Sequence, residues 1–221
     1  MARLPGGASA RLTTRQAMDQ TTVAVHRWPA SRPLLAAAPE AGPDLIVISI
    51  ATPDSTLRHA ARAQLRGAVR EVLGLRLGSS PGAIALVSKP GQALRVDLPG
   101  HTIGLSASHE AGFSVAAIHR CGPVGVDIVR LRDEFEWQPV ARDYLGMDAF
   151  ERIACQAQPE QMQAFAREWT RLEACLKYLG IGLQEWSLSL AHRLGACRVS
   201  ELELPAGLCG AVVYGLTDQA S

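Results

Sequence analysis

An almost continuous apolar run at residues 44–51, DLIVISIA, constrains the fold of this chain most strongly. A strand that is apolar on both faces suits a sheet that is buried on both sides. The residues that follow predict a helix over 56–73, because Asp54 or Ser55 can cap its N-terminus and Gly74 can take its C-terminal capping position. The chain is therefore expected to combine sheet and helix.

The predicted helix over 56–73 has two different faces. Its apolar residues recur at helical spacing and predict the buried face, which consists of Leu57, Ala61, Leu65, Ala68 and Val72. Arginines recur at four-residue steps and form a basic ridge, which consists of Arg58, Arg62, Arg66 and Arg70. Such a ridge is most often a solvated face, although arginine also makes bidentate contacts with phosphate groups.

The rest of the chain repeats a similar order of elements. Further strands are expected at residues 23–28, 102–108, 113–119, 124–131, 186–190, 198–204 and 211–216. Helices are expected at residues 138–144, 147–157 and 159–179. The short links after residues 108 and 119 suit an antiparallel meander. This order predicts an α+β protein of two similar lobes.

Composition excludes several classes of protein. The 221 residues are 48% apolar, yet no apolar run reaches the roughly 18 residues of a membrane span, and no signal pattern opens the chain. We therefore expect a cytoplasmic protein with no membrane partner. The net charge of +1 gives no reason to expect a nucleic-acid partner. Five scattered cysteines without a C-x-x-C pair predict neither disulfides nor a zinc site, and are interpreted as buried hydrophobes.

A carboxylate interrupts the apolar strand predicted at 124–131. Asp127 and Val129 point to one face of this strand, and Val126 and Ile128 point to the other. A buried carboxylate needs a partner because an unpaired one is energetically costly, so Asp127 is solvated, hydrogen-bonded or metal-bound. By itself, a structural aspartate is the commoner explanation.

A second carboxylate lies on the predicted helix 159–179. The buried stripe of this helix consists of Phe165, Trp169, Leu172, Leu176 and Leu179. Glu173 and Lys177 flank the stripe one turn apart, which by itself indicates an ordinary surface ion pair. Together with Asp127, however, they can assemble a magnesium and phosphate site from two elements that are distant in sequence.

Two further segments carry groups that suit a phosphate ligand. Ser108 and His109 end a predicted strand, and Lys89 precedes Pro90 and Gly91 in a turn. Each of these residues alone is more often an ordinary surface residue.

Taken in their order along the chain (Lys89, Ser108 with His109, Asp127, then Glu173 with Lys177), these segments resemble a known family. Their signature blocks are similar to those of the Sfp-type 4'-phosphopantetheinyl transferases, roughly G-[VI]-D and W-[ST]-x-K-E-[AS]-x-x-K. Residues 125–127 read GVD, and residues 169–177 read WTRLEACLK. The chain departs from the family at Leu172, where the family has lysine, and at Val129, where many members have a second acid. Ser88 replaces the glycine of a family G-K-P block.

The resemblance implies a phosphopantetheinyl transferase fold, in which two lobes are related by a pseudo-twofold axis and each has a small, mostly antiparallel sheet packed on helices. We expect a flexible leader at residues 1–20, an N-terminal lobe at 21–104 and a C-terminal lobe at 105–221 that carries the metal site. The family transfers the 4'-phosphopantetheine arm of coenzyme A to a serine of an acyl or peptidyl carrier protein, which makes these the expected partners of a monomeric enzyme.

The resemblance also implies residue roles. Asp127 and Glu173 would bind Mg²⁺, Glu173 would also act as general base, and Lys177 would contact the diphosphate. Coenzyme A would be held by Arg62, Lys89, Ser108 and His109. Val129 and Leu172 support an alternative, a non-catalytic module that binds coenzyme A or a carrier protein. A different α+β protein that binds coenzyme A is a further alternative.

Overall fold

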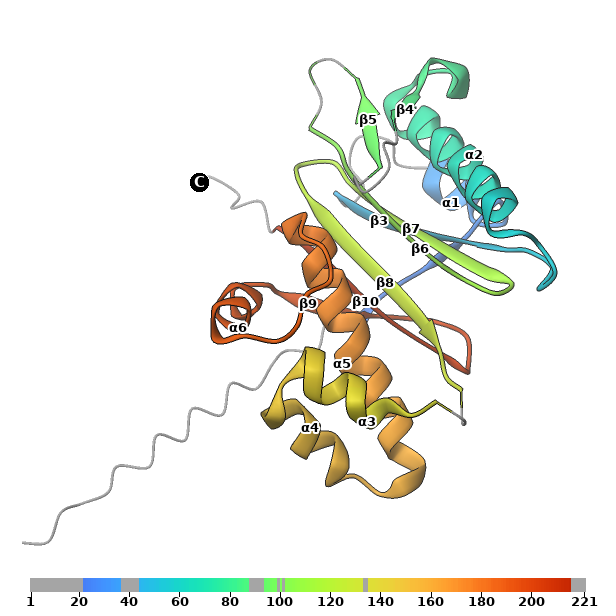
Figure 1. Cartoon of the computed structure of the whole chain (residues 1–221). Coiled ribbons are helices and arrows are strands. Elements are labelled where there is room, and N and C mark those ends of the chain that lie inside the picture. The colour runs from blue at the N-terminus through green and yellow to red at the C-terminus, as the bar shows by residue number, and fades with distance from the viewer. Residues whose placement is uncertain are drawn as a thin grey trace, which may run out of the picture.

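The computed structural model describes residues 22–36, 44–87, 94–98, 100, 102–132 and 135–215. Within them the chain forms six α-helices and two mixed sheets (Figure 1). The strands are β1 (Thr22–Val23), β2 (His26–Arg27), β3 (Leu45–Ala51), β4 (Ala85–Val87), β5 (Arg95–Asp97), β6 (Gly104–Glu110), β7 (Phe113–His119), β8 (Val124–Arg130), β9 (Val199–Leu202) and β10 (Leu208–Tyr214). The helices are α1 (Arg32–Ala36), α2 (Arg58–Leu77), α3 (Trp137–Val140), α4 (Met147–Ala154), α5 (Gln158–Leu179) and α6 (Leu188–Gly195), with a 3₁₀ turn η1 (Pro81–Ala83) and a π turn η2 (Ala141–Leu145). This confirms an α+β protein.

The two sheets draw on distant parts of the chain. One has the order β2-β3-β7-β6-β5-β4, and the other has the order β1-β9-β10-β8. Each is antiparallel except for one short parallel pair, β2 with β3 in the first sheet and β1 with β9 in the second. β6 and β7 belong to the same sheet as β2 to β5, so the sheets divide between β7 and β8, except that the short N-terminal strand β1 joins the second sheet.

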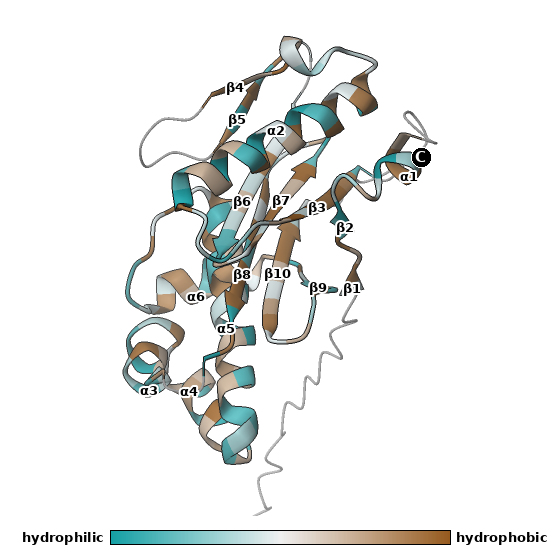
Figure 2. Ribbon diagram, turned by 90° about the vertical axis from the view of Figure 1, so that its right-hand side faces the viewer, coloured by the Kyte–Doolittle hydropathy of each residue, from teal (hydrophilic) through white to brown (hydrophobic). Residues whose placement is uncertain are grey.

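Alternation along the strands builds four layers. Ile46, Ile48 and Ile118 pack with α2, whereas Val47 and Val115, on the opposite face of the same sheet, pack against the second sheet. In the second sheet, the side chains that meet the first are Val124, Val126, Ile128, Leu202 and Val212. The outer face of that sheet packs on α5. Helices α2 and α5 thus lie on opposite sides of the paired sheets, and Figure 2 shows the strands between them as largely apolar.

Strand β3 shows why its apolar run predicted a doubly covered sheet. Both of its faces are buried, one under α2 and the other under the second sheet. The helices predicted at 138–144, 147–157 and 159–179 and the strand at 113–119 match elements of the structure within a few residues. The buried stripe of helix α5 is confirmed for Phe165, Leu172 and Leu176.

Four expectations about local structure are wrong. Helix α2 continues through Gly74 to Leu77, because Leu75 and Leu77 still pack on the core and Gly78 takes the left-handed conformation with φ of 63°. Its N-cap is Leu57, which lies outside the buried face and has 65% of its surface exposed.

The other two wrong expectations concern strands. β8 does not extend the β6–β7 meander but pairs with β10 in the second sheet. Residues 186–190 do not form a strand, because Ser187 Oγ accepts a hydrogen bond from the Leu190 N–H at 3.2 Å and caps α6.

The cysteines are only partly as expected. Cys175 and Cys209 are buried and Cys197 is half-buried, but Cys121 and Cys155 are exposed. The interpretation of all five as buried hydrophobes is therefore wrong for two of them. No helix in the part of the chain that the structure describes is long and apolar enough to cross a membrane.

Candidate functional site

A cleft of about 900 Å³ lies between α2, the sheet edges and α5. It brings together nearly all of the side chains that the sequence singled out. Those that line it are Arg58, Arg62, Arg66, Ser108, His109, Asp127, Val129, Glu173 and Lys177. Lys89 lies outside the residues that the structure describes.

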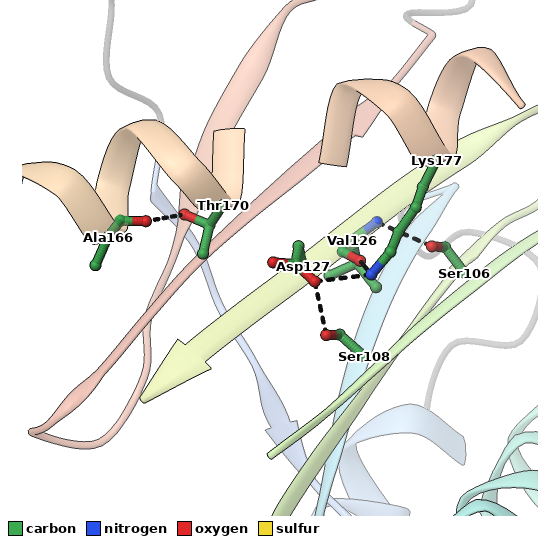
Figure 3. Close-up of polar contacts among 7 residues, drawn as sticks. All are labelled: Ser106, Ser108, Val126, Asp127, Ala166, Thr170 and Lys177. Atoms are coloured by element: carbon green, nitrogen blue, oxygen red, sulfur yellow. Dashed lines mark hydrogen bonds and ion pairs between the residues drawn. The ribbon is translucent and has the colours of Figure 1, made fainter. Parts of the chain in front are cut away.

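Asp127 is the buried acid of this cleft, with 7% of its surface exposed. Its Oδ1 accepts a hydrogen bond from Ser108 Oγ at 2.8 Å and forms an ion pair with Lys177 Nζ at 2.7 Å. Figure 3 shows both partners on the same side of the carboxylate, while its other oxygen points away from them. The buried charge is thereby compensated, as burial of a carboxylate requires.

Lys177 connects α5 to β8. Besides Asp127, its Nζ donates to the main-chain oxygen of Val126 at 3.0 Å. The ammonium group of Lys177 therefore pairs with β8, and the ordinary surface ion pair with Glu173 that the helix spacing indicated is not the pairing found. Because its ammonium group is still half-buried at the cleft wall, it supplies a fixed positive charge there.

Glu173 lies half-buried in the cleft, one turn of α5 before Lys177. Burial raises the pKa of the Glu173 carboxyl above its ordinary value, and the negative charge of Asp127 raises it further. Lys177 acts in the opposite direction. A carboxyl whose pKa is raised toward neutrality is suited to accept a proton as a general base.

A basic wall faces these carboxylates. Arg58 and Arg62 are exposed and Arg66 is half-buried on α2, and all three line the cleft. Arg70 differs, because its Nε donates to the Ile84 carbonyl at 3.2 Å away from the cleft. The arginine ridge is thus divided, with its first three members at the cleft.

His109 lies between the basic wall and Lys177. Burial lowers its pKa to about 4, and the neighbouring charges of Arg62, Arg58, Lys177 and Arg66 add to this effect. Its Nδ1 shares a hydrogen bond of 2.8 Å with Ser114 Oγ. The imidazole is therefore neutral at physiological pH, among cations that can hold an anionic ligand.

A close approach of α5 to β8 sets the geometry of the acidic pair. A Cβ at Gly125 would lie 2.0 Å from the Ala174 carbonyl oxygen, so only glycine leaves room for the helix here. Ala174 directly follows Glu173, and Asp127 lies two residues after Gly125 on the same face of β8. The glycine therefore brings the two carboxylates to one wall.

The acidic pair has the chemistry of a magnesium site. Mg²⁺ takes oxygen ligands and often needs only one or two carboxylates, with waters and substrate phosphates as its other ligands. Asp127 raises the pKa of Glu173, so the two acids repel each other, and a cation between them would relieve that repulsion. Among the described residues, no three His, Cys, Asp or Glu side chains form a metal-binding group. The carboxylates that the cleft offers to such an ion are those of Asp127 and Glu173, whose oxygens are of the type that Mg²⁺ takes.

The structure explains why Leu172 replaces the lysine of the family pattern. Its side chain has 5% of its surface exposed and packs with Leu176 and Leu190 between α5 and α6. Val129 lies on the cleft side of β8, two residues after Asp127. Of the two departures from the family pattern, Leu172 therefore lies in the core, whereas Val129 lies in the site.

Sequence reasoning missed two residues of this site, Ser106 and Arg95, and the role of a third, Gly125 of the GVD block. Ser106 Oγ accepts a hydrogen bond from the Val126 N–H at 3.0 Å, and Arg95 of β5 lines the cleft. Gly125 allows the close contact with α5. An isolated glycine in a strand is a signal of close backbone approach, but nothing in the local sequence distinguishes Ser106 or Arg95.

Part of the chain is similar to a known protein family. Residues 123–205 match the family model described as the 4'-phosphopantetheinyl transferase superfamily. The matched segment includes Asp127, Glu173 and Lys177. No curated protein matches the chain. The match supports assignment to the superfamily that the signature blocks resemble.

Proposed function

Because residues 123–205 match the model of the 4'-phosphopantetheinyl transferase superfamily, we propose that the chain transfers the 4'-phosphopantetheine arm of coenzyme A to a serine hydroxyl of an apo carrier protein. The activity would be of the holo-[acyl-carrier-protein] synthase type, with an acyl or peptidyl carrier protein as acceptor. The observation that carries the proposal is that a basic wall faces Asp127, Glu173 and Lys177 across one cleft.

The charges of the cleft suit coenzyme A, which carries phosphates at two places. Arg62 and His109 lie at the wall formed by α2 and β6 and would bind phosphates there. Lys89 is proposed as a further phosphate contact. Lys177, at the opposite wall, would contact the diphosphate. Arginine and lysine suit this purpose because charge-assisted hydrogen bonds to phosphate are among the strongest in proteins.

In the transfer, the oxygen of the carrier serine forms a bond to the β-phosphorus of coenzyme A. The bond from that phosphorus to the bridging oxygen breaks, and adenosine 3',5'-bisphosphate leaves. Glu173, which lies in the cleft beside Lys177, would take the serine proton, directly or through a water molecule. Lys177 and Arg62 would hold the diphosphate in place, so that positioning and fixed charge supply most of the acceleration.

Asp127 and Glu173 would hold Mg²⁺, which when bound would neutralise charge on the diphosphate. Asp127 is already hydrogen-bonded by Ser108 and Lys177. The proposal further includes that the protein is a monomer, that it is cytoplasmic and that its two lobes are related by a pseudo-twofold axis. The lobe boundary at 104 and 105 stays a prediction, although the membership of β6 and β7 in the first sheet favours a later one.

The test is an intact-mass assay. Incubated with coenzyme A, magnesium and a panel of apo carrier proteins from fatty-acid, polyketide and peptide synthesis, the chain should add about 340 Da to one of them, as expected for covalent transfer to a hydroxyl. Asp127→Ala and Glu173→Ala should each lower the rate about a hundredfold or more. Glu151→Ala, which removes an exposed acid of α4, is the matched control and should leave the rate unchanged.

A non-catalytic binding module is the second candidate, and Val129 is the observation that favours it, because a valine lies where many family members place a second acid. The two functions give different results in the same assay. A folded protein that binds coenzyme A in calorimetry, but modifies no carrier of the three types, would select the binding module and refute the transferase.

A further inference from the structure

Two consecutive residues of β8 are held by side chains from other elements (Figure 3). Ser106 Oγ accepts from the Val126 N–H at 3.0 Å, and Ser108 Oγ donates to Asp127 Oδ1 at 2.8 Å. Lys177 Nζ donates to the Val126 oxygen and to Asp127 Oδ1 at 3.0 and 2.7 Å. Main chain and side chain are therefore anchored together.

The two serines work across the junction of the sheets. β6 belongs to the first sheet and β8 to the second, so the two strands are not neighbours in a backbone ladder. Ser106 and Ser108 alternate with Leu105 and Ala107, which puts both hydroxyls on the face of β6 that meets β8. Their hydrogen bonds therefore fix the position of Asp127 relative to the first sheet, on which α2 with its basic wall packs.

The bond made by Ser108 also limits what else this residue can do. Ser108 has 8% of its surface exposed, and a serine hydroxyl has one proton to donate. In the structure that proton goes to Asp127 Oδ1. A phosphate oxygen only accepts hydrogen bonds, so Ser108 cannot donate to a phosphate while it holds Asp127.

We propose that Ser108 is a positioning residue that orients the Asp127 carboxylate through Oδ1, and not a contact of the coenzyme A phosphates as the family resemblance implies. Ser106 supports it by fixing the main chain of the preceding residue. Oδ2 of Asp127 is thereby kept for a ligand in the cleft. The part of this inference that concerns a metal ligand rests on the proposed function.

The first experiment separates orientation of Asp127 from ligand contact. Ser108→Ala should weaken Mn²⁺ binding, measured by electron paramagnetic resonance, about tenfold, as expected when a hydrogen bond to a metal ligand is removed. The affinity for adenosine 3',5'-bisphosphate in metal-free buffer, measured by calorimetry, should stay within about twofold, because no phosphate contact is lost. Ser108→Thr keeps the hydroxyl and should restore Mn²⁺ binding.

The second experiment needs neither metal nor nucleotide, and so remains decisive if the proposed function fails. Lys89 and Lys177 are the only lysines of the chain, so a nitrogen NMR spectrum of the side-chain ammonium groups has two signals, which Lys177→Gln assigns. Ser108→Ala should speed hydrogen exchange at the Lys177 ammonium several-fold, because the carboxylate that it binds becomes mobile. Ser79→Ala, a serine that donates to Leu77 away from the cleft, should not.

The outcomes are distinct. Faster exchange at Lys177 in Ser108→Ala, with recovery in Ser108→Thr, supports the inference whether or not any carrier protein is modified. Unchanged exchange together with a tenfold or greater loss of nucleotide affinity would overturn it and return Ser108 to the phosphate site. If Ser108→Ala does not fold, Ser108→Cys replaces it, because a thiol keeps the shape but donates only weakly.

Discussion

Replacing Gly125 with alanine should disrupt both the fold and the site, because α5 lies directly on β8 at this position. The added Cβ would lie 2.0 Å from the Ala174 oxygen and 2.5 Å from the Tyr178 nitrogen. Both atoms belong to the backbone of the helix, so no change of rotamer can relieve the contact. The helix itself has to move.

The size of that movement follows from the contact distances. Ordinary van der Waals contact begins at 3.4 Å, so the helix would have to retreat by roughly 1.4 Å. Overpacking of a buried contact costs about 1–3 kcal/mol, and a clash with rigid backbone belongs at the upper end, about 3 kcal/mol. Since Glu173 and Lys177 move with the helix, the distance from each of them to Asp127 would increase as well.

Urea unfolding monitored by tryptophan fluorescence measures this change in the free energy of unfolding. Gly67→Ala is the matched control, because Gly67 lies in α2 and a Cβ there would have nothing within 4 Å. That variant should gain about 0.5–1 kcal/mol from the better helix propensity of alanine. A Gly125→Ala protein as stable as the wild type, within about 0.5 kcal/mol, would refute the close approach of α5 described above.

Three further predictions concern other residues of the site and its support. Leu172→Lys, which restores the family lysine, should lower the free energy of unfolding by at least about 2 kcal/mol, because it places a charge in a buried cluster; wild-type stability in urea would contradict this. Val129→Glu should place a second carboxylate beside Asp127 and lower the magnesium concentration for half-maximal carrier modification, and an unchanged magnesium titration would argue against the assigned metal position. The pKa of His109 is lowered to about 4 in the folded state, whereas in the unfolded chain this histidine protonates near pH 6.5. The contribution of the neutral imidazole to stability is therefore present above pH 6.5 and is lost as the pH falls from about 6.5 to 4. His109→Asn should flatten stability against pH in this window, which denaturation curves at several pH values would test; an equally steep loss in the variant would assign the effect to other groups.

The elements that could be predicted from sequence are those with a strong period of their own. Helix α5 has apolar residues at helical spacing from Phe165 onward, and β7 is an apolar run between turns, so both were found within a residue or so. Residues 186–190, WSLSL, show why the same reasoning fails elsewhere. Their alternation is typical of a strand, but the Ser187 cap and the burial of Leu190 against Leu172 and Leu176 favour a helix. Tertiary contact decides the structure there.

The site was partly predictable for a related reason. Asp127, Glu173 and Lys177 fall within ordered blocks, and the structure brings them to one cleft with Arg62, Ser108 and His109. The direct ion pair between Lys177 and Asp127 was not foreseen, because the distance between a helix and a strand depends on Gly125 and on packing across the second sheet. Nor could the local sequence show that Ser108 donates to Asp127, since β6 and β8 lie in different sheets.

The layered arrangement of the sheets bears on which parts of the chain can exist alone. The segment that matches the family model, residues 123–205, contains β8, β9 and α5 but not β6, β7 or α2. Separated from the first sheet, β8 would expose Val124, Val126 and Ile128 to water, an apolar face that Val47 and Val115 now cover. A polypeptide reduced to that segment would also lack α2 and β6, and with them Arg62 and His109, so it would keep the acidic wall of the cleft and lose the basic one.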